Sequence, residues 1–195
     1  MTNVNEKNVA KTVSFKEETI NHVLTKINDL IGSGQLVLQP NYSAANALQA
    51  AWFKLLEIPK GKDKPLIELC TKSSIANALF KMVADGLNPG KNQVYFIPYG
   101  TKLECQRSYQ GSIALAKRHG KLEKIAANVI YEGDDFSFDI DIESGCKKIK
   151  NHSSSITNIG GKIIGAYAVC VLEDGTSFAE IMSIGQIQKA WEQGV

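Results

Sequence analysis

The sequence predicts an α+β fold in which helices flank a mainly antiparallel sheet. Apolar residues recur at helical spacing in the first half of the chain, whereas alternating and β-branched runs separated by turn residues dominate the second half. Helices and strands that are segregated along a chain in this way are typical of the α+β class. At 195 residues and 44% apolar composition, the chain is long enough for a folded domain with a hydrophobic core.

Two amphipathic helices are expected before the basic loop 57–65 (EIPKGKDKP). Ser14 and Glu17 form a capping-box pattern ahead of an apolar stripe that ends at Gly32, and a second stripe follows Ser43. The segment 32–41 between them reads as a loop or extended link, so we expect the first helix to pack at a distance from the core. The expected division is an N-terminal helical or oligomerisation segment, 1–40, and a core, 41–195.

A third helix, roughly 73–85, should lead into a hairpin. The strands NQVYFIPY and KLECQRSY are joined by Gly100 and Thr101, a pair suited to a type II′ turn. Because side chains alternate across a strand, Tyr95 and Tyr99 should lie on the face opposite the core. The residues expected on the core face, with the last at its edge, are Val94, Phe96, Pro98, Leu103, Cys105 and Arg107.

The second half should begin with a short helix, QGSIALAKRHG, that closes at Gly120. The strand KIAANVIYE, an acidic hairpin around DDFSFDIDIESGCKKIK, and a second hairpin, KIIGAYAVCVL and TSFAEIMSI, follow. The second hairpin turns at Asp174 and Gly175, and IGQIQKAWEQ is expected to form the last helix.

The segment GLNPGKN, 86–92, raises the question of a phosphate site. A nucleotide-binding P-loop has four residues between its glycines and Ser or Thr after the lysine. Here three residues separate Gly86 from Gly90, Asn92 follows Lys91, and the loop leads from a helix into a strand. An ATP site is therefore disfavoured, but Lys91 or the neighbouring amides could contact a phosphate of another kind.

Charge is unevenly distributed along the chain. Residues 54–124 carry 13 basic and six acidic side chains, a net charge of +7, whereas residues 125–195 carry five and ten, a net charge of −5. This asymmetry suggests a polyanionic partner or a head-to-tail contact between neighbouring subunits. An uneven, solvated surface is the alternative.

Cations and tyrosines are interleaved in the middle of the chain. Lysine and arginine can neutralise backbone phosphates while exposed rings stack on bases, which together make a binding site for single-stranded nucleic acid. Cations in the last turn of a helix also favour the helix dipole without any ligand. The set comprises Tyr95, Tyr99, Lys102, Arg107, Tyr109, Lys117, Arg118, His119, Lys121 and Lys124.

The acidic hairpin offers an enzymatic alternative. Its carboxylates could bind a divalent cation such as Mg²⁺, as in metal-dependent nucleases, but Asp139 and Asp141 alternate with isoleucines as on the solvent face of a strand. No general base is clearly tied to them, and the dispersed Cys and His residues form no metal box or nucleophile motif. We expect no catalytic residue and no assigned cofactor. The carboxylates are Glu132, Asp134, Asp135, Asp139, Asp141 and Glu143.

Two further expectations concern the surroundings of the core. The residues Lys147, Lys148, Lys150, Asn151 and His152 form a loop that could add a second basic contact. No signal peptide or membrane-length apolar run is present, so we expect a cytoplasmic protein without membrane partners.

The run GLNPGKNQVYFIPYGTKLECQRSYQGSIALAKRHG, followed by IYEGDDFSF, KIKNH and GAYAVCVLEDGTSFAEIMS, resembles the RecT family of phage and prophage recombinases, the single-strand annealing proteins. The likeness covers most of 69–191 and is greatest to RecT proteins of Gram-positive phages. It implies ATP-independent binding and annealing of single-stranded DNA by an oligomeric ring or filament. The implied fold is related to the Red beta type, with a β-β-β-α unit lining a positively charged outer groove.

The resemblance also implies site residues and partners. Tyr95, Arg107, Tyr109, Lys117 and Arg118 should line the groove, with Asn92, Gln93 and Lys102 at its rim; Lys91 and Lys121 complete the candidate set. The implied partners are single-stranded DNA, annealed duplex, further copies of the chain, a phage exonuclease and the host single-strand-binding protein. A charged C-terminal region usually follows the position of Val195 in this family, and we expect it to be absent here.

Overall fold

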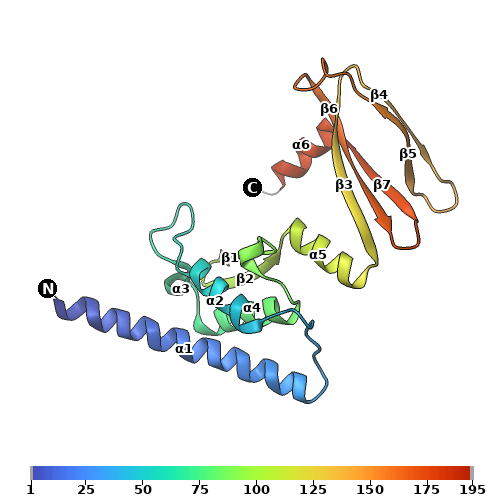
Figure 1. Ribbon diagram of the computed structural model, residues 1–195. Coiled ribbons are helices and arrows are strands. Elements are labelled where there is room, and N and C mark those ends of the chain that lie inside the picture. Colours follow the sequence, from blue (N-terminus) through green and yellow to red (C-terminus); the bar gives the residue numbers. More distant parts are fainter. Residues whose placement is uncertain (1, 194–195) are drawn as a thin grey trace. The chain divides into compact units, whose positions relative to one another are not determined.

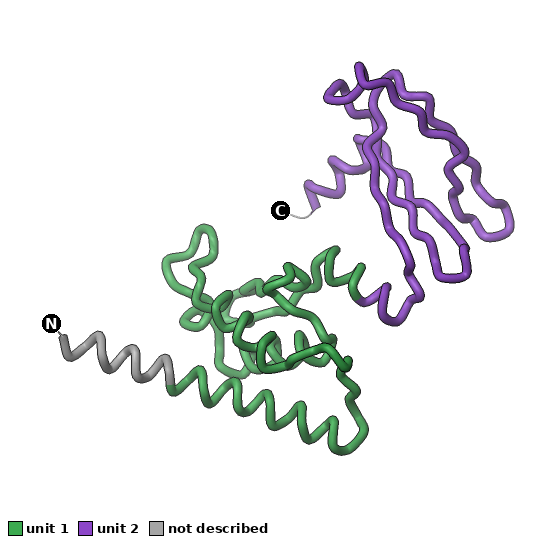
Figure 2. The backbone as a smooth tube through the Cα atoms, viewed as in Figure 1, with its two compact units in different colours: residues 1–114 green, residues 115–195 purple. Residues whose placement is uncertain are grey.

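The computed structural model describes the backbone of residues 2–193 and the side chains of residues 14–193. It divides into two compact units, Met1–Ala114 and Leu115–Val195 (Figure 2). Both helices and antiparallel sheets are present, which confirms the predicted α+β class. Whether the segment 1–40 serves oligomerisation stays a prediction.

The first unit packs helices against a two-stranded sheet (Figure 1). The hairpin has the predicted register, with Phe96 opposite Cys105 and a turn at Gly100. Its elements are α1 (Thr2–Gly32), α2 (Ala44–Leu55), α3 (Leu66–Leu69), α4 (Lys72–Ala84), the 3-10 turn η1 (Pro89–Lys91), β1 (Val94–Tyr99), β2 (Lys102–Arg107) and α5 (Tyr109–His119), whose last turns belong to the second unit.

Helix α1 differs from its prediction in two respects. It begins at Thr2, so Ser14 lies inside the helix and is not its cap; the sequence ahead of Ser14 has no Pro or Gly to stop a helix. It also packs against α4 and α2, with Val23 and Ile27 each only 1% exposed. The expectation that this helix lies away from the core is therefore wrong, because its apolar stripe completes the core of its own unit.

The hairpin lies on the amino-terminal part of α4. The buried Ser74 hydroxyl accepts a hydrogen bond from the backbone N–H of Leu103 at 3.1 Å, and Leu103 and Cys105 are buried. Burial of apolar surface here fixes one face of the hairpin and leaves the other outward. Since α5 follows β2 directly, these elements form a β-β-α unit rather than the implied β-β-β-α unit.

The second unit is a five-stranded antiparallel sheet with the strand order β3-β6-β7-β5-β4. A capping box formed by Ser183 and Gln186 starts its last helix directly after β7. The elements are β3 (Leu122–Tyr131), β4 (Asp135–Ile140), β5 (Lys147–Ser153), β6 (Ile163–Leu172), β7 (Ser177–Ser183) and α6 (Ile184–Glu192).

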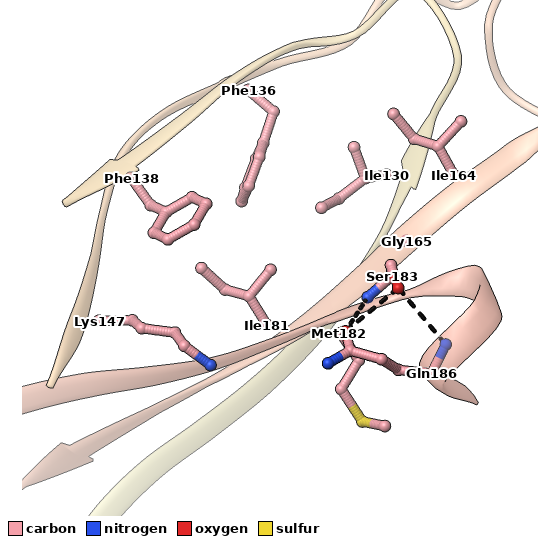
Figure 3. A pocket seen from close by; sticks show the side chains of 10 residues that line it. All are labelled: Ile130, Phe136, Phe138, Lys147, Ile164, Gly165, Ile181, Met182, Ser183 and Gln186. Atoms are coloured by element: carbon pink, nitrogen blue, oxygen red, sulfur yellow. Dashed lines mark hydrogen bonds between the residues drawn. The ribbon is translucent and has the colours of Figure 1, made fainter. Parts of the chain in front are cut away.

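Aromatic side chains hold the β4–β5 hairpin to the rest of this sheet. Phe136 stacks on Tyr167 with ring centroids 5.5 Å apart, and His152 meets both rings edge-on. Figure 3 shows Phe136 and Phe138 above Ile181 in an adjoining apolar pocket of about 320 Å³. None of the helices in the described part of the chain is long and apolar enough to cross a bilayer.

Candidate nucleic-acid interface

The loop 86–93 spends its backbone N–H groups on itself. Apart from proline, each of its residues donates to an acceptor within the loop or in the last turn of α4. The pairs are Gly86 to Val83 O (2.9 Å), Leu87 to Met82 O (3.0 Å), Asn88 to Gln93 Oε1 (2.9 Å), Gly90 to Asn88 Oδ1 (2.8 Å), Lys91 to Asn88 O (3.2 Å), Asn92 to Pro89 O (3.0 Å) and Gln93 to Asn88 O (3.3 Å).

This arrangement excludes the amide alternative for phosphate contact. A phosphate-binding nest needs several N–H groups that converge on open space, whereas these N–H groups point into the loop. Any contact from this loop to a phosphate must therefore come from side chains, of which those of Lys91 and Asn92 are exposed. The predicted contact by neighbouring amides is wrong, and the one by Lys91 stays a prediction.

The first turn of α5 lies against this loop. The N–H of Ser108 donates to the carbonyl oxygen of Gln93 at 3.0 Å, and its hydroxyl donates to that of Asn92 at 2.6 Å. The same hydroxyl accepts from the N–H of Gly111 at 3.1 Å. Ser108 is only 5% exposed, so these bonds are shielded from competing water. Loop and helix are thereby joined at their backbones.

Two rim candidates in the loop have different roles. Gln93 is half-buried and uses its side-chain oxygen to close the loop, so this atom is not offered to a ligand. Asn92 adopts the left-handed region with φ of 53°, which asparagine tolerates better than most residues, and its side chain is exposed. Together with Tyr95, Asn92 lines a pocket of about 170 Å³.

The outward face of the hairpin carries exposed rings, as the alternation predicts. Tyr95 is 52% exposed and Tyr99 55%, and Tyr109 at the start of α5 is 71% exposed. Gln106 donates to the Tyr99 hydroxyl at 2.7 Å and orients that ring. Base stacking requires accessible rings held on a rigid support, and these three meet that requirement.

The two hairpin cations have different surroundings. Lys102 forms an ion pair with Glu104 at 2.5 Å, and the hydrogen bond and charge of Lys102 lower the pKa of Glu104. Arg107 lies at the other end of β2 and is exposed, with its Cγ atom beside the first turn of α5. Within the described residues, Arg107 and Lys91 have no ion-pair partner, whereas half of the electrostatic value of Lys102 is cancelled locally by its partner.

The remaining candidates belong to the second unit. Lys117 and Arg118 lie in the last turns of α5, as predicted, where Lys117 is exposed and Arg118 is half-buried. Lys121 is exposed and has φ of 53°, and its carbonyl oxygen accepts from the N–H of Glu173 at 2.9 Å. The structure describes each unit by itself, so a single groove that includes both groups stays a prediction.

The acidic hairpin forms ion pairs rather than a metal cluster. Asp139 contacts Lys150 at 2.5 Å and Asp141 contacts Lys148 at 3.4 Å. Among the residues that the structure describes, no three His, Cys, Asp or Glu side chains could hold a metal ion. The same pairs neutralise lysines that we expected to form a second basic contact, and Lys147 is likewise paired with Glu180 at 2.6 Å.

Asp134 departs from the solvated-face interpretation of this hairpin. Its side chain is fully buried, accepts from the N–H of Tyr131 at 2.8 Å, and lies 3.2 Å from His152 Nε2. A hydrogen bond from Ser154, followed by those from Asn158, Tyr131 and His152, lowers the pKa of Asp134 despite its burial. The carboxylate therefore holds the turn before β4. In contrast, Ile140 and Ile142 are exposed, so the predicted alternation does not bury them in this chain.

Sequence reasoning missed the residues that position the loop. Ser108, Gln110 and Gly111 were read only as parts of a strand end and a short helix. A glycine inside a helix is unfavourable by itself and marks a close backbone approach, which was the available signal. The hydroxyl partner of Asn92 had no such signal, because the contact depends on tertiary structure.

The comparisons with known proteins follow the same segment. The family model described as "RecT family" matches residues 53–194, which is more than half of the chain. The chain belongs to the RecT family. The match includes β1, β2, α5 and the whole described sheet of the second unit, so both candidate groups lie within the RecT region.

A curated RecT relative agrees with this assignment. The chain is 29% identical over 136 residues to "Protein RecT" of Escherichia coli (strain K12), across 64% of this chain and 48% of the relative. The chain thus spans about half the length of the curated RecT protein that it matches. The family likeness supports the predicted class of DNA recombination proteins.

Proposed function

We propose that this chain binds single-stranded DNA and anneals complementary strands without ATP during homologous recombination. The proposal rests on membership of the RecT family together with the chemistry of the first unit. No catalytic residue is part of it. Single-stranded DNA and the annealed duplex are the proposed ligands, in the cytoplasm of a bacterial host.

The observation that carries the proposal is the combination of exposed rings and exposed cations on one braced hairpin. Tyr95, Tyr99 and Tyr109 are at least half exposed, and Arg107 extends beside the first turn of α5. Rings of this kind stack on any base, and cations neutralise phosphates without reading sequence. Binding would therefore tolerate any sequence, which leaves recognition to base pairing between the two strands.

Annealing also requires that two negatively charged backbones approach each other. Binding of each phosphate by Lys or Arg releases counterions, which favours complex formation at low salt. The net charge of +7 in residues 54–124 supports such a role. Several subunits on one strand would add avidity, so we propose a homo-oligomer in ring or filament form. A phage exonuclease and the host single-strand-binding protein are the proposed protein partners.

Equilibrium binding tests the first half of the proposal. The full chain is titrated against a fluorescently labelled oligonucleotide at several salt concentrations, with and without Mg²⁺, and the DNA is then examined for cleavage. The expected result is salt-sensitive binding that leaves the strand intact. Absence of binding would contradict the proposal, and Mg²⁺-dependent shortening of the strand would favour a nuclease instead.

A further inference from the structure

The first turn of α5 contacts three consecutive carbonyl groups of the loop at Lys91–Gln93. Ser108 donates through its N–H to Gln93 (3.0 Å) and through its hydroxyl to Asn92 (2.6 Å). With its amide group oriented to satisfy both of its atoms, Gln110 donates to the carbonyl oxygens of Lys91 at 3.0 Å and Asn92 at 3.2 Å. Each of the three carbonyl groups therefore has a donor from the helix.

The fit between these segments is close enough to select one loop conformation. A Cβ atom on Gly111 would lie 2.2 Å from the carbonyl oxygen of Gln93, so the backbones meet where no larger side chain could stand. Asn92 is held in the left-handed region, which a non-glycine residue adopts only when its surroundings impose it. The loop amides are used internally, and its carbonyls are used by α5.

What remains outward are the side chains of Lys91 and Asn92. Both are exposed, and neither is held by an ion pair in the described part of the chain. Lysine loses much rotamer freedom on binding, and a mobile loop would add its own ordering cost. A loop that is fixed before binding avoids the second of these costs.

We propose that Ser108 and Gln110 are positioning residues that lock the loop 88–93 in its DNA-binding conformation. This inference rests on the proposed function. Neither residue needs to touch DNA, because each acts through the backbone that carries Lys91 and Asn92. When the binding-competent conformation falls to a fraction of the population, the apparent Kd rises by the reciprocal of that fraction.

A double-mutant cycle tests the lock. Ser108→Ala and Gln110→Ala are each made in the wild-type chain and in a Lys91→Ala/Asn92→Gly background, whose loop presents no side chain and keeps its left-handed residue. Kd for a labelled single-stranded oligonucleotide is measured at fixed salt. We expect roughly a tenfold rise in the wild-type chain, if one-tenth of the loop stays competent, and about no change in the background that lacks the loop side chains.

Controls separate this role from general damage to the fold. Gln188→Ala removes an exposed glutamine from α6 and should leave Kd unaltered. Amide hydrogen exchange at Lys91, Asn92 and Gln93 should accelerate in both positioning variants while the core of α4 stays protected. If Ser108→Ala unfolds the hairpin, Gln110→Ala decides, because Gln110 is only half-buried.

The outcomes distinguish the two proposals. An unchanged Kd in Gln110→Ala, or the same rise in both backgrounds, overturns the lock even if wild-type binding is strong. A wild-type chain that does not bind the oligonucleotide overturns the proposed function and the DNA role of the lock with it. Exchange rates that stay the same in both variants show that α5 does not hold the loop at all.

Discussion

Gly111 and Gln93 approach so closely that a Cβ atom on the glycine would lie 2.2 Å from the glutamine carbonyl oxygen. Real Cβ atoms do not come this near to an oxygen, so the contact explains why α5 carries glycine in its first turn. We expect Gly111→Ala to force the helix away from the loop and to lower the free energy of unfolding by about 1–3 kcal/mol.

Gly185 provides a matched control for this prediction. It also lies in the first turn of a helix, α6, but a Cβ atom there would meet nothing within 4 Å. Gly185→Ala should leave stability unchanged or raise it by up to about 1 kcal/mol, since alanine favours the helix. Thermal unfolding of both variants gives the comparison, and equal effects would show that the close approach is unimportant.

Tyr95 is expected to act as a stacking platform. Tyr95→Ala should weaken binding of a single-stranded oligonucleotide by about 1–3 kcal/mol, because an exposed ring that stacks on a base is lost. Tyr95→Phe keeps the ring and should bind as the wild type does. Fluorescence titration distinguishes them; equal weakening of both variants would indicate that the hydroxyl, not the ring, contacts the ligand.

Arg107 is expected to contact the DNA backbone. Since its side chain is exposed, Arg107→Ala should weaken DNA binding while the melting temperature stays near that of the wild type. Lys162→Ala removes an equal charge that is already paired with Glu132 at 2.7 Å, and should bind normally. If Lys162→Ala weakens binding as much, only net charge matters at these positions.

Lys117 and Arg118 test the alternative explanation by the helix dipole. The double variant Lys117→Ala/Arg118→Ala should flatten the dependence of log K on log salt by ~1.4 if each cation binds one phosphate of a single strand. Affinity measured across a salt series gives this slope. A slope equal to that of the wild type would mean that these cations only complement the carboxyl end of α5.

Asp134 predicts how stability depends on pH. Its pKa is lowered in the folded protein, so its stabilising contribution is complete above the ordinary Asp pKa of about 4 and is lost as the pH falls below it. Asp134→Asn should therefore be less stable than the wild type at pH 7, with the difference shrinking below about pH 4.

Asp139→Asn is the matched control for the pH measurement. Its carboxylate is exposed and forms a surface ion pair with Lys150, so the substitution should change stability by less than about 1 kcal/mol. Unfolding of the three proteins is followed at several pH values. A difference between Asp134→Asn and the wild type that does not vary with pH would assign the effect to packing rather than ionisation.

The sequence predicted local structure well and tertiary contacts poorly. The hairpin register and the start of α2 at Ser43 were confirmed, because strand alternation, turn residues and helix caps act over a few residues. The start of α1 was wrong because the pattern at Ser14 satisfies the capping rule although the helix continues through it. The capping rule recognises a possible start and does not exclude helix on its other side.

The candidate site shows the same division. Residue type and alternation identified the exposed tyrosines, whose position on the hairpin depends only on strand geometry. The ion pairs that occupy Lys102 and Lys150, and the hydroxyl of Ser108 on Asn92, could not be read from spacing. They depend on which side chains meet in space, and they decide which cations and amides remain available to a ligand.

Annealing of two complementary labelled oligonucleotides by the full chain, without ATP, tests the central claim most directly. The strands are added one after the other, the duplex is followed by energy transfer between the labels, and a gel shows whether the strands stay intact. We predict pairing faster than the spontaneous rate and suppressed by high salt. Pairing at the spontaneous rate, or strands shortened in the presence of Mg²⁺, would contradict the account.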